Sequence, residues 1–235
     1  MSVRTRKTMS LAVTDCSLEP LNDGLTIAYA TSLGVFALAE LIAFLLIKFS
    51  NPRESIVYTN ILFTLQIVLY TALLLGQGSF YEQKLGICLP WLRWAVYAFS
   101  CALLALKKAK RSGMTFTATV LFVAMISLTL LLGAFSAASA TLEKRWGWFG
   151  LGFWPYLIAI LVLYRARSPG LFWFVLITWT FYPIIYLFGP ALLNMYSTTV
   201  ESWLYLAADV GFTKIAFEAY DYMTECKKSV KSTYA

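Results

Sequence analysis

Four ionisable side chains lie well inside apolar stretches of the sequence: Glu40, Arg93, Asp209 and Lys214. A charge inside a membrane is costly, so such residues are functional candidates by default. Lys214 lies deepest, in the middle of LAADVGFTKIAF. An amine in a dry pocket can form a Schiff base with an aldehyde, or it can form a structural pair with Asp209. Arg93 also has a simpler interpretation, as a residue at a helix end whose charge reaches the interface.

The stretches that must hold these residues are long and apolar. The chain has 235 residues, of which 60% are hydrophobic and 13% charged, whereas a soluble domain has about 25% charged residues. One membrane span needs roughly 20 apolar residues, so seven spans with short loops use up most of the chain. We therefore expect an all-α membrane protein, a bundle of seven transmembrane helices. The expected spans are 24–49, 55–77, 88–107, 114–137, 146–165, 170–192 and 199–224.

The distribution of basic residues predicts the orientation of the bundle. One set of loops, together with the C-terminal tail, carries Lys48, Arg53, Lys107, Lys108, Lys110, Arg111, Arg165, Arg167, Lys227, Lys228 and Lys231. The other set carries Lys84, Lys144 and Arg145. The richer set is expected in the cytoplasm and the N-terminus outside. Because most basic residues flank apolar runs, the net charge of +7 does not indicate a nucleic-acid partner.

Several spans carry motifs that resemble those of one known family. Residues 179–189 read WTFYPIIYLFG, similar to the pattern W-x-x-Y-P-x-x-[WY]-x-x-G of bacteriorhodopsin and its relatives. Residues 91–101 read WLRWAVYAFSC, similar to the family's R-Y-x-x-W segment with exchanged aromatic residues. The family spacing after Gly189 reaches Glu201 and Asp209, both acidic as expected. The sequence thus resembles the microbial (type 1) rhodopsins over all seven spans.

This resemblance implies all-trans retinal, bound as a Schiff base on Lys214, between the third, fifth, sixth and seventh spans. It divides the chain into an extracellular segment 1–23, a seven-helix retinal-binding domain 24–226 and a cytoplasmic tail 227–235. The missing backbone N–H of Pro183 should kink the sixth helix. The residues expected around the chromophore are Tyr97, Trp179, Tyr182 and Tyr186 along the polyene, Gly152 and Tyr156 at its ring end, and Cys101 and Asp209.

Two positions depart from the pattern of the family's proton pumps. Val96 stands where the third-helix counterion is expected, and Lys107 stands where pumps have an internal proton donor. A pump needs one carboxylate to accept the Schiff-base proton and another to return one. Outward proton pumping by the usual route is therefore disfavoured.

The spacing in the seventh span is also unusual, because Asp209 precedes Lys214 by five residues where the family has four. On a regular α-helix four residues span about 40° of rotation and five span about 140°. A single π-helical bulge would restore the pairing, and such bulges favour functional sites. We expect this bulge; in the alternative, Val210 fills the position and Glu40 or water compensates the amine.

Channelrhodopsins are the branch that the third span resembles most. Ser100 and Cys101 follow its Arg, and channelrhodopsins have Cys where pumps have Thr. The family pairs this Cys with a polar group on the fourth helix, for which Ser127 is the expected residue. Cys is also a common buried hydrophobic residue, so this similarity has a purely structural alternative.

The second span contains no Asp or Glu between Ile56 and Gln77. Thr59, Gln66 and Tyr70 share one of its faces, and Gln66 falls where channel relatives carry a Glu near the gate. Neutral or basic linings admit anions, whereas rings of carboxylates favour cations. In the alternative, this polar stripe only bonds neighbouring helices.

The second-span lining and the lost pump carboxylates together predict a light-gated anion channel in the plasma membrane. A sensory rhodopsin that signals to a partner and an atypical light-driven pump are the alternatives. Expected partners are the lipid bilayer, anions such as chloride, and further copies of the chain in a dimer or trimer. The sequence has no His, no metal-ligand cluster and no nucleotide-binding loop, so no enzymatic activity is expected.

Three further expectations concern the two ends of the bundle. Glu201 aligns with an outer carboxylate of pumps and is either a channel vestibule charge or merely a helix-end residue. Glu218 lies one turn beyond Lys214 and is expected to pair with Lys107 in an inner constriction. Cys16 and Cys88 fall on the expected outer side, where disulfides persist, so they form either a bridge to each other or an intersubunit Cys16 bond.

Overall fold

The computed structural model describes residues 16, 23–49, 53–82, 87–166, 169–219 and 222–223. Most of the expected extracellular segment 1–23 and all of the expected tail 227–235 lie outside these residues. The interpretation of both segments therefore stays a prediction.

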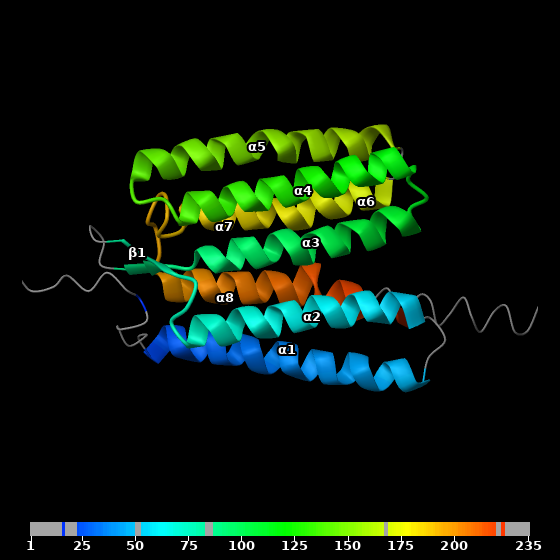
Figure 1. Ribbon diagram of the computed structural model, residues 1–235, viewed down its shortest axis with the longest axis horizontal. Coiled ribbons are helices and arrows are strands. Elements are labelled where there is room, and N and C mark those ends of the chain that lie inside the picture. The colour runs from blue at the N-terminus through cyan, green and yellow to red at the C-terminus, as the bar shows by residue number, and fades with distance from the viewer. Residues whose placement is uncertain are drawn as a thin grey trace, which may run out of the picture.

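Within the described residues, seven helical rods run side by side, as the sequence predicts (Figure 1). The sixth and seventh rods each contain one π-helical turn. The first five are α1 (Asp23–Phe49), α2 (Arg53–Leu74), α3 (Trp91–Arg111), α4 (Phe116–Ala137) and α5 (Leu142–Arg165). The sixth is α6 (Pro169–Phe174), η1 (Val175–Trp179) and α7 (Thr180–Phe188). The seventh begins with α8 (Thr198–Ala208) and η2 (Asp209–Thr213) and continues as a helix over 215–219.

The sequence analysis missed a short hairpin between α2 and α3. Strand β1 (Phe80–Glu82) pairs with β2 (Ile87–Leu89) in antiparallel register, with Tyr81 opposite Cys88. The span expected from residue 88 therefore begins as a strand, and its helix starts at Trp91. Cys88 forms a disulfide with Cys16 of the same chain. Of the two expected alternatives, the bridge within one chain is therefore the one observed, and the intersubunit Cys16 bond is not. We call this end of the bundle the hairpin end.

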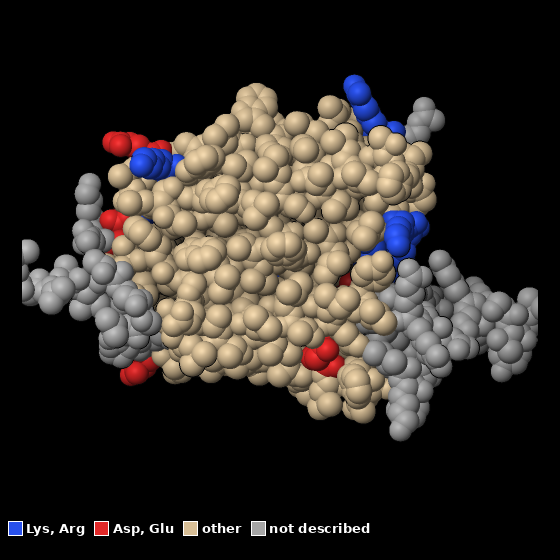
Figure 2. Space-filling model, in the orientation of Figure 1, with Lys and Arg blue, Asp and Glu red and all other residues tan. Residues whose placement is uncertain are grey.

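The opposite end of the bundle carries most of the described basic residues, and we call it the basic end. Five of the helices are long and apolar enough to cross a membrane, over 23–46, 57–74, 116–137, 142–165 and 169–188. Charged side chains gather at the two ends, and the face between them is almost entirely uncharged (Figure 2). Large apolar side chains such as Leu38, Phe44 and Trp154 point outward, as contact with lipid requires.

Helix α3 does not meet the same criterion, because it carries Arg93 and a basic C-terminal turn with Lys108, Lys110 and Arg111. Arg93 is buried inside the bundle with an exposed fraction of 1%. The interpretation of Arg93 as a residue reaching out to the interface is therefore wrong. The charge of Arg93 faces the protein interior, where Glu201 and Ser202 of the seventh helix supply its partners.

Candidate functional site

Lys214 lies in the centre of the bundle, and only 1% of its surface is exposed. Its Nζ donates to Asp209 Oδ2 at 2.9 Å and to Gln66 Oε1 at 3.0 Å. The same Nζ lies 3.7 Å from the centroid of the Tyr97 ring, within the range of a cation–π contact. A second ring, that of Phe36, lies 5.9 Å away, so the amine has one charged acceptor, one neutral acceptor and two aromatic neighbours.

The π-helical turn that the spacing predicts is present at η2. The backbone N–H of Lys214 donates to the carbonyl of Asp209, five residues earlier, at 2.9 Å. This extra residue per turn brings both side chains to one face of the helix, as the ion pair shows. The alternative with Val210 in the slot is wrong. Glu40 does not compensate the amine either, because it accepts a hydrogen bond from Thr64 at 3.3 Å and is partly exposed.

Asp209 is completely buried and is fixed by two tyrosines from neighbouring helices. Tyr97 of α3 donates to Oδ2 at 2.8 Å, and Tyr182 of α7 donates to Oδ1 at 2.5 Å. Tyr182 also shares a hydrogen bond with Thr213 at the end of η2. Because both carboxylate oxygens accept hydrogen bonds, the carboxyl group of Asp209 is held in a fixed position beside the amine.

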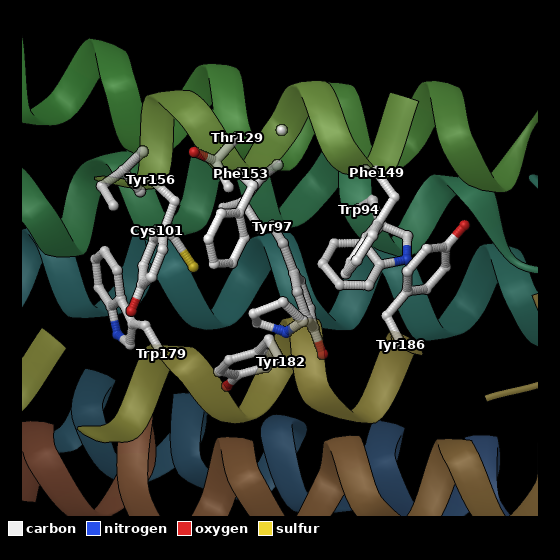
Figure 3. Close-up of a pocket in the computed structure, with 15 residues that line it drawn as sticks. Trp94, Tyr97, Cys101, Thr129, Phe149, Phe153, Tyr156, Trp179, Tyr182 and Tyr186 are labelled. Carbon is white, nitrogen blue, oxygen red and sulfur yellow. The ribbon is translucent and has the colours of Figure 1, made fainter. Parts of the chain in front are cut away.

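An aromatic pocket lies beside this cluster, between α3, α4, α5 and the sixth helix (Figure 3). Seven of the residues expected around the chromophore line it. These are Tyr97, Cys101, Gly152, Tyr156, Trp179, Tyr182 and Tyr186, joined by Trp94, Ile126, Thr129, Leu130, Gly133, Phe149, Phe153 and Pro183. Tyr97 and Tyr182 line the pocket and also donate to Asp209, so they connect the pocket to the Lys214–Asp209 pair.

Gly133 leaves room for the Trp94 ring in the pocket wall, because a Cβ on Gly133 would lie 3.1 Å from Trp94 Cε3, closer than usual contact. Gly152 adds a second wall position without a side chain. At the far end, the hydroxyls of Tyr156 and Thr180 are 2.6 Å apart. The aromatic walls and the missing side chains fit a conjugated polyene that extends from the amine toward Tyr156.

The sixth helix owes its shape to Pro183 and to the π-helical turn before it. Pro183 has no backbone N–H, so the carbonyl of Trp179, four residues earlier, lacks its usual helical donor. The turn η1 ends at this same Trp179, whose ring lines the pocket. The expected irregularity at Pro183 therefore lies directly at the pocket wall.

A second buried cluster lies toward the basic end. Lys107 of α3 forms the expected ion pair with Glu218 of the seventh helix, and both are buried. Thr59 of α2 donates to Glu218 Oε2 at 2.5 Å and accepts from Lys107 Nζ at 3.2 Å. Three helices thus meet at one closed polar contact.

A third buried cluster lies toward the hairpin end. Arg93 pairs with Glu201 at 3.7 Å and donates to Ser202 at 3.0 Å. Its guanidinium carbon lies 4.6 Å from the centroid of the Tyr205 ring. Glu201 is buried in the first turn of α8, so it is not an exposed vestibule charge in this structure.

One expected polar pairing is wrong, and the structure shows the surroundings of two further channel candidates, Ser100 and Tyr70. Ser127 does not pair with Cys101, because its hydroxyl reaches across to the backbone carbonyl of Ala98 at 3.4 Å. Ser100 donates to the carbonyl of Tyr97 in its own helix at 3.4 Å. Tyr70 is fully buried and stacks on Phe36, and its hydroxyl makes no hydrogen bond within the described residues.

Sequence reasoning missed a polar chain that joins the pocket to the hairpin. Tyr186 donates to Ser136 at 2.9 Å, and Ser136 donates to the carbonyl of Arg145 at 2.8 Å. Arg145 forms a buried ion pair with Glu82 of β1. The sequence analysis used Arg145 only as a basic residue of a loop. Nothing in the neighbouring sequence indicates that its partner, Glu82, lies in a hairpin 63 residues away.

Comparison with known proteins finds one matching family and several solved structures with the same seven-helix fold. The model of the family described as bacteriorhodopsin-like protein matches residues 24–224. Schizorhodopsin 4 is 25% identical and superimposes with a TM-score of 0.76 over 84% of this chain and 98% of that one. The light-driven proton pump LR (Mac) from Leptosphaeria maculans is 19% identical, with a TM-score of 0.78 over 89% and 97%.

Halorhodopsin, a light-driven chloride pump, is also 19% identical, with a TM-score of 0.74 over 84% of this chain and 92% of that one. Curated protein sequences give no match. The family match spans all seven helices, including Lys214 and its aromatic surroundings. The chain therefore belongs to the bacteriorhodopsin-like family of microbial rhodopsins, multi-pass membrane proteins that bind retinal through a Schiff-base lysine.

Proposed function

We propose that this rhodopsin carries its retinal on Lys214 and acts as a light-gated anion channel. The observation that carries the proposal is a row of three buried ion pairs along the contact between α3 and the seventh helix. They are Lys107–Glu218, Lys214–Asp209 and Arg93–Glu201. Retinal supplies the absorption of visible light and a change of shape on illumination.

The two outer pairs close the space between α3 and the seventh helix. Apart from the central Lys214–Asp209 pair, which belongs to the seventh helix, each pair joins a cation of α3 to a carboxylate of the seventh helix. Helix α2 adds neutral groups at the same levels, with Thr59 at the basic end and Gln66 in the centre. Movement of the seventh helix against α3 would break the outer two contacts and admit water.

The charge of the opened path favours anions. Separation of the pairs exposes Lys107 and Arg93 on α3 and also Glu218 and Glu201 on the seventh helix. Helix α2 adds neutral oxygen and amide groups and no carboxylate from Ile56 onward, so the face formed by α3 and α2 is basic and neutral. Basic and neutral linings stabilise a passing anion, whereas rings of carboxylates select cations. Chloride is the anion that we expect to pass under physiological conditions.

The same residues argue against outward proton pumping. Val96 offers no carboxylate beside the amine, and Asp209 already accepts two tyrosine hydroxyls. At the donor position, Lys107 is a cation held by Glu218. Accepting and returning a proton needs a free carboxylate on each side of the Schiff base, and these positions do not provide it.

The orientation and assembly are part of this proposal. Because basic residues concentrate in cytoplasmic loops, the basic end with Lys110, Arg111 and Arg165 faces the cytoplasm and the hairpin faces outward (Figure 2). We further propose that the protein forms homo-oligomers, either dimers or trimers, in the plasma membrane.

Whole-cell recording under illumination tests the proposed function. We expect a light-dependent current that changes sign at a definite voltage, in cells whose membranes carry the retinal absorption band. A current of one sign at all voltages would instead indicate a pump. Full absence of current, with coloured protein present at the surface, would leave the sensory alternative and refute the channel.

A further inference from the structure

Phe153, in the middle of α5, belongs both to the wall of the aromatic pocket and to the outer surface of the bundle. It lines the pocket, and 49% of its surface is exposed. Gly152 and Tyr156, its neighbours in the same wall, are buried. At Phe153 a single side chain therefore separates the pocket from the surrounding lipid.

The pocket wall between α5 and α7 consists of side chains that extend from the two helices toward each other (Figure 3). On one side of Phe153, the hydroxyls of Tyr156 and Thr180 are 2.6 Å apart. On its other side, the ring centroids of Phe149 and Tyr186 are 5.8 Å apart. Phe153 falls between these two contacts along α5, so it is the side chain that closes the wall between them.

The walls that α4 forms with its neighbours are closed by the backbone itself. A Cβ on Gly152 of α5 would be in van der Waals contact with α4, at 3.4 Å from both Leu132 Cβ and the carbonyl oxygen of Thr129. Between α4 and α3, the hydroxyl of Ser127 reaches the carbonyl of Ala98 at 3.4 Å. Opening these walls requires the helices to separate, whereas the α5–α7 wall opens when side chains rotate.

We propose that the pocket takes up retinal from the bilayer through this α5–α7 wall, with Phe153 as the movable side chain of the entrance. Retinal is an apolar aldehyde, so it dissolves among the acyl chains that Phe153 faces. Outward rotation of Phe153 costs little, because lipid tails are as apolar as a protein interior and exposed side chains change rotamer within nanoseconds. The inference rests on the proposed retinal site at Lys214 and is independent of the proposed channel activity.

The sixth helix is built to bend at the level of this entrance. Pro183 lines the pocket and has no backbone N–H, and the π-helical turn η1 ends four residues before it at Trp179. Kinks concentrate at prolines and π-helical turns, so α7 can move away from α5 there. Thr180 donates to the carbonyl of Leu176, so the hydrogen bond between Tyr156 and Thr180 has Tyr156 as its donor. This bond is the contact that must break when the two helices separate.

The rate at which apoprotein in nanodiscs takes up all-trans retinal from added liposomes tests the entrance. Borohydride stops the reaction at chosen times, and the mass of the intact chain gives the fraction that carries retinal. We expect Phe153→Ala to load several-fold faster, because the wall is open, and Phe153→Trp to load several-fold more slowly. Trp154→Ala is the matched control, since Trp154 is 67% exposed on the same helix but is absent from the described pocket lining. It should load at the unaltered rate.

Chemical blocking of the entrance separates closure from misfolding. Apoprotein of Phe153→Cys, labelled with a bulky maleimide, should load far more slowly than the same protein before labelling. Trp154→Cys labelled in the same way should load at its original rate. Each comparison uses one protein before and after labelling, and the chain's own thiols are common to both variants. Phe153→Cys that is labelled after loading should keep its visible absorption band.

Equal loading rates for Phe153→Ala, Phe153→Trp and the unaltered protein would overturn the lateral entrance, and so would undiminished loading of labelled Phe153→Cys. If the unaltered protein never acquires the mass of retinal, the proposed site on Lys214 fails and the entrance fails with it. The readout is the fraction of loaded chains, so absence of photocurrent would refute the channel and leave the entrance standing.

Discussion

At the scale of single residues, the amine of Lys214 has two acceptors of different character. Asp209 is charged and lies at 2.9 Å, while the Gln66 oxygen is neutral and lies at 3.0 Å. Once the amine carries retinal it keeps one proton and can donate one strong hydrogen bond. Asp209 and Gln66 are then alternative acceptors of that one hydrogen bond, and the negative charge of Asp209 favours the bond to Asp209.

The hydroxyl of Tyr97 weakens the negative charge of Asp209 by donating to it at 2.8 Å. Tyr97→Phe keeps the ring in the pocket and removes this donor. The carboxylate should then stabilise the positive resting chromophore more strongly, which moves the visible absorption maximum to shorter wavelength. Absorption spectroscopy of purified protein measures the shift.

Tyr205→Phe is the matched control for this prediction. Tyr205 packs 6.2 Å from Tyr97, ring centroid to centroid, but its hydroxyl donates to the carbonyl of Tyr182 at 3.5 Å. Its removal should leave the maximum in place. Equal spectra for Tyr97→Phe and the unaltered protein would show that the hydrogen bond has no electrostatic effect on the chromophore.

At the scale of elements, the π-helical turn η2 decides whether Asp209 and Lys214 meet. Deletion of Gly211, an exposed residue inside η2, shortens the spacing to the four residues that suit a regular α-helix. We expect this deletion to keep the ion pair and the retinal absorption band, because the helix on both sides keeps its register.

Deletion of Ala207, in α8 before the turn, is the corresponding control. It leaves the five-residue spacing from Asp209 to Lys214 unchanged, so either the position of Lys214 in the bundle or the register of Glu201 against Arg93 must be lost. We expect a strongly shifted or absent absorption band. Equal spectra for the two deletions would mean that the π-helical turn does not set the geometry.

Local spacing predicted some elements and missed others for a physical reason. The seven spans follow from the length of the apolar stretches, and the turn η2 follows from the five-residue spacing, both of which act within one helix. The hairpin β1–β2 has three-residue strands, and its ion pair joins Glu82 to Arg145 across the fold. Contacts between distant segments leave no periodic signal in the sequence.

The Glu82–Arg145 pair fastens this hairpin to the bundle. Removal of one member of a buried pair leaves an uncompensated charge and costs about 3–5 kcal/mol. Glu82→Gln should therefore lower the temperature at which the protein loses its retinal colour. In the double variant Glu82→Gln/Arg145→Gln much of that loss should be recovered, and identical melting of Glu82→Gln and the unaltered protein would contradict this account.

At the scale of the whole molecule, the three buried ion pairs form one row through the bundle. If the protein is the proposed channel, the Lys107–Glu218 pair at the basic end should hold it closed in the dark, because this pair joins α3 to the seventh helix. Glu218→Gln removes the carboxylate and should slow the decay of the photocurrent after the light is switched off.

Lys108→Gln is the control for the closing contact. Lys108 is buried on the same helix but lies over the Phe217 ring at 3.2 Å instead of pairing with Glu218. The photocurrent of the Lys108→Gln variant should therefore decay at the normal rate after the light is switched off. Normal closing and conductance in Glu218→Gln would remove the Lys107–Glu218 pair from the gate.

The most direct test of the central claim is the reversal potential of the photocurrent as external chloride is replaced by a large impermeant anion. A conduction path lined by Arg93, Lys107 and neutral groups of α2 predicts a positive shift of about 59 mV for a tenfold reduction of chloride. A reversal potential that ignores chloride and follows sodium or protons would contradict an anion channel.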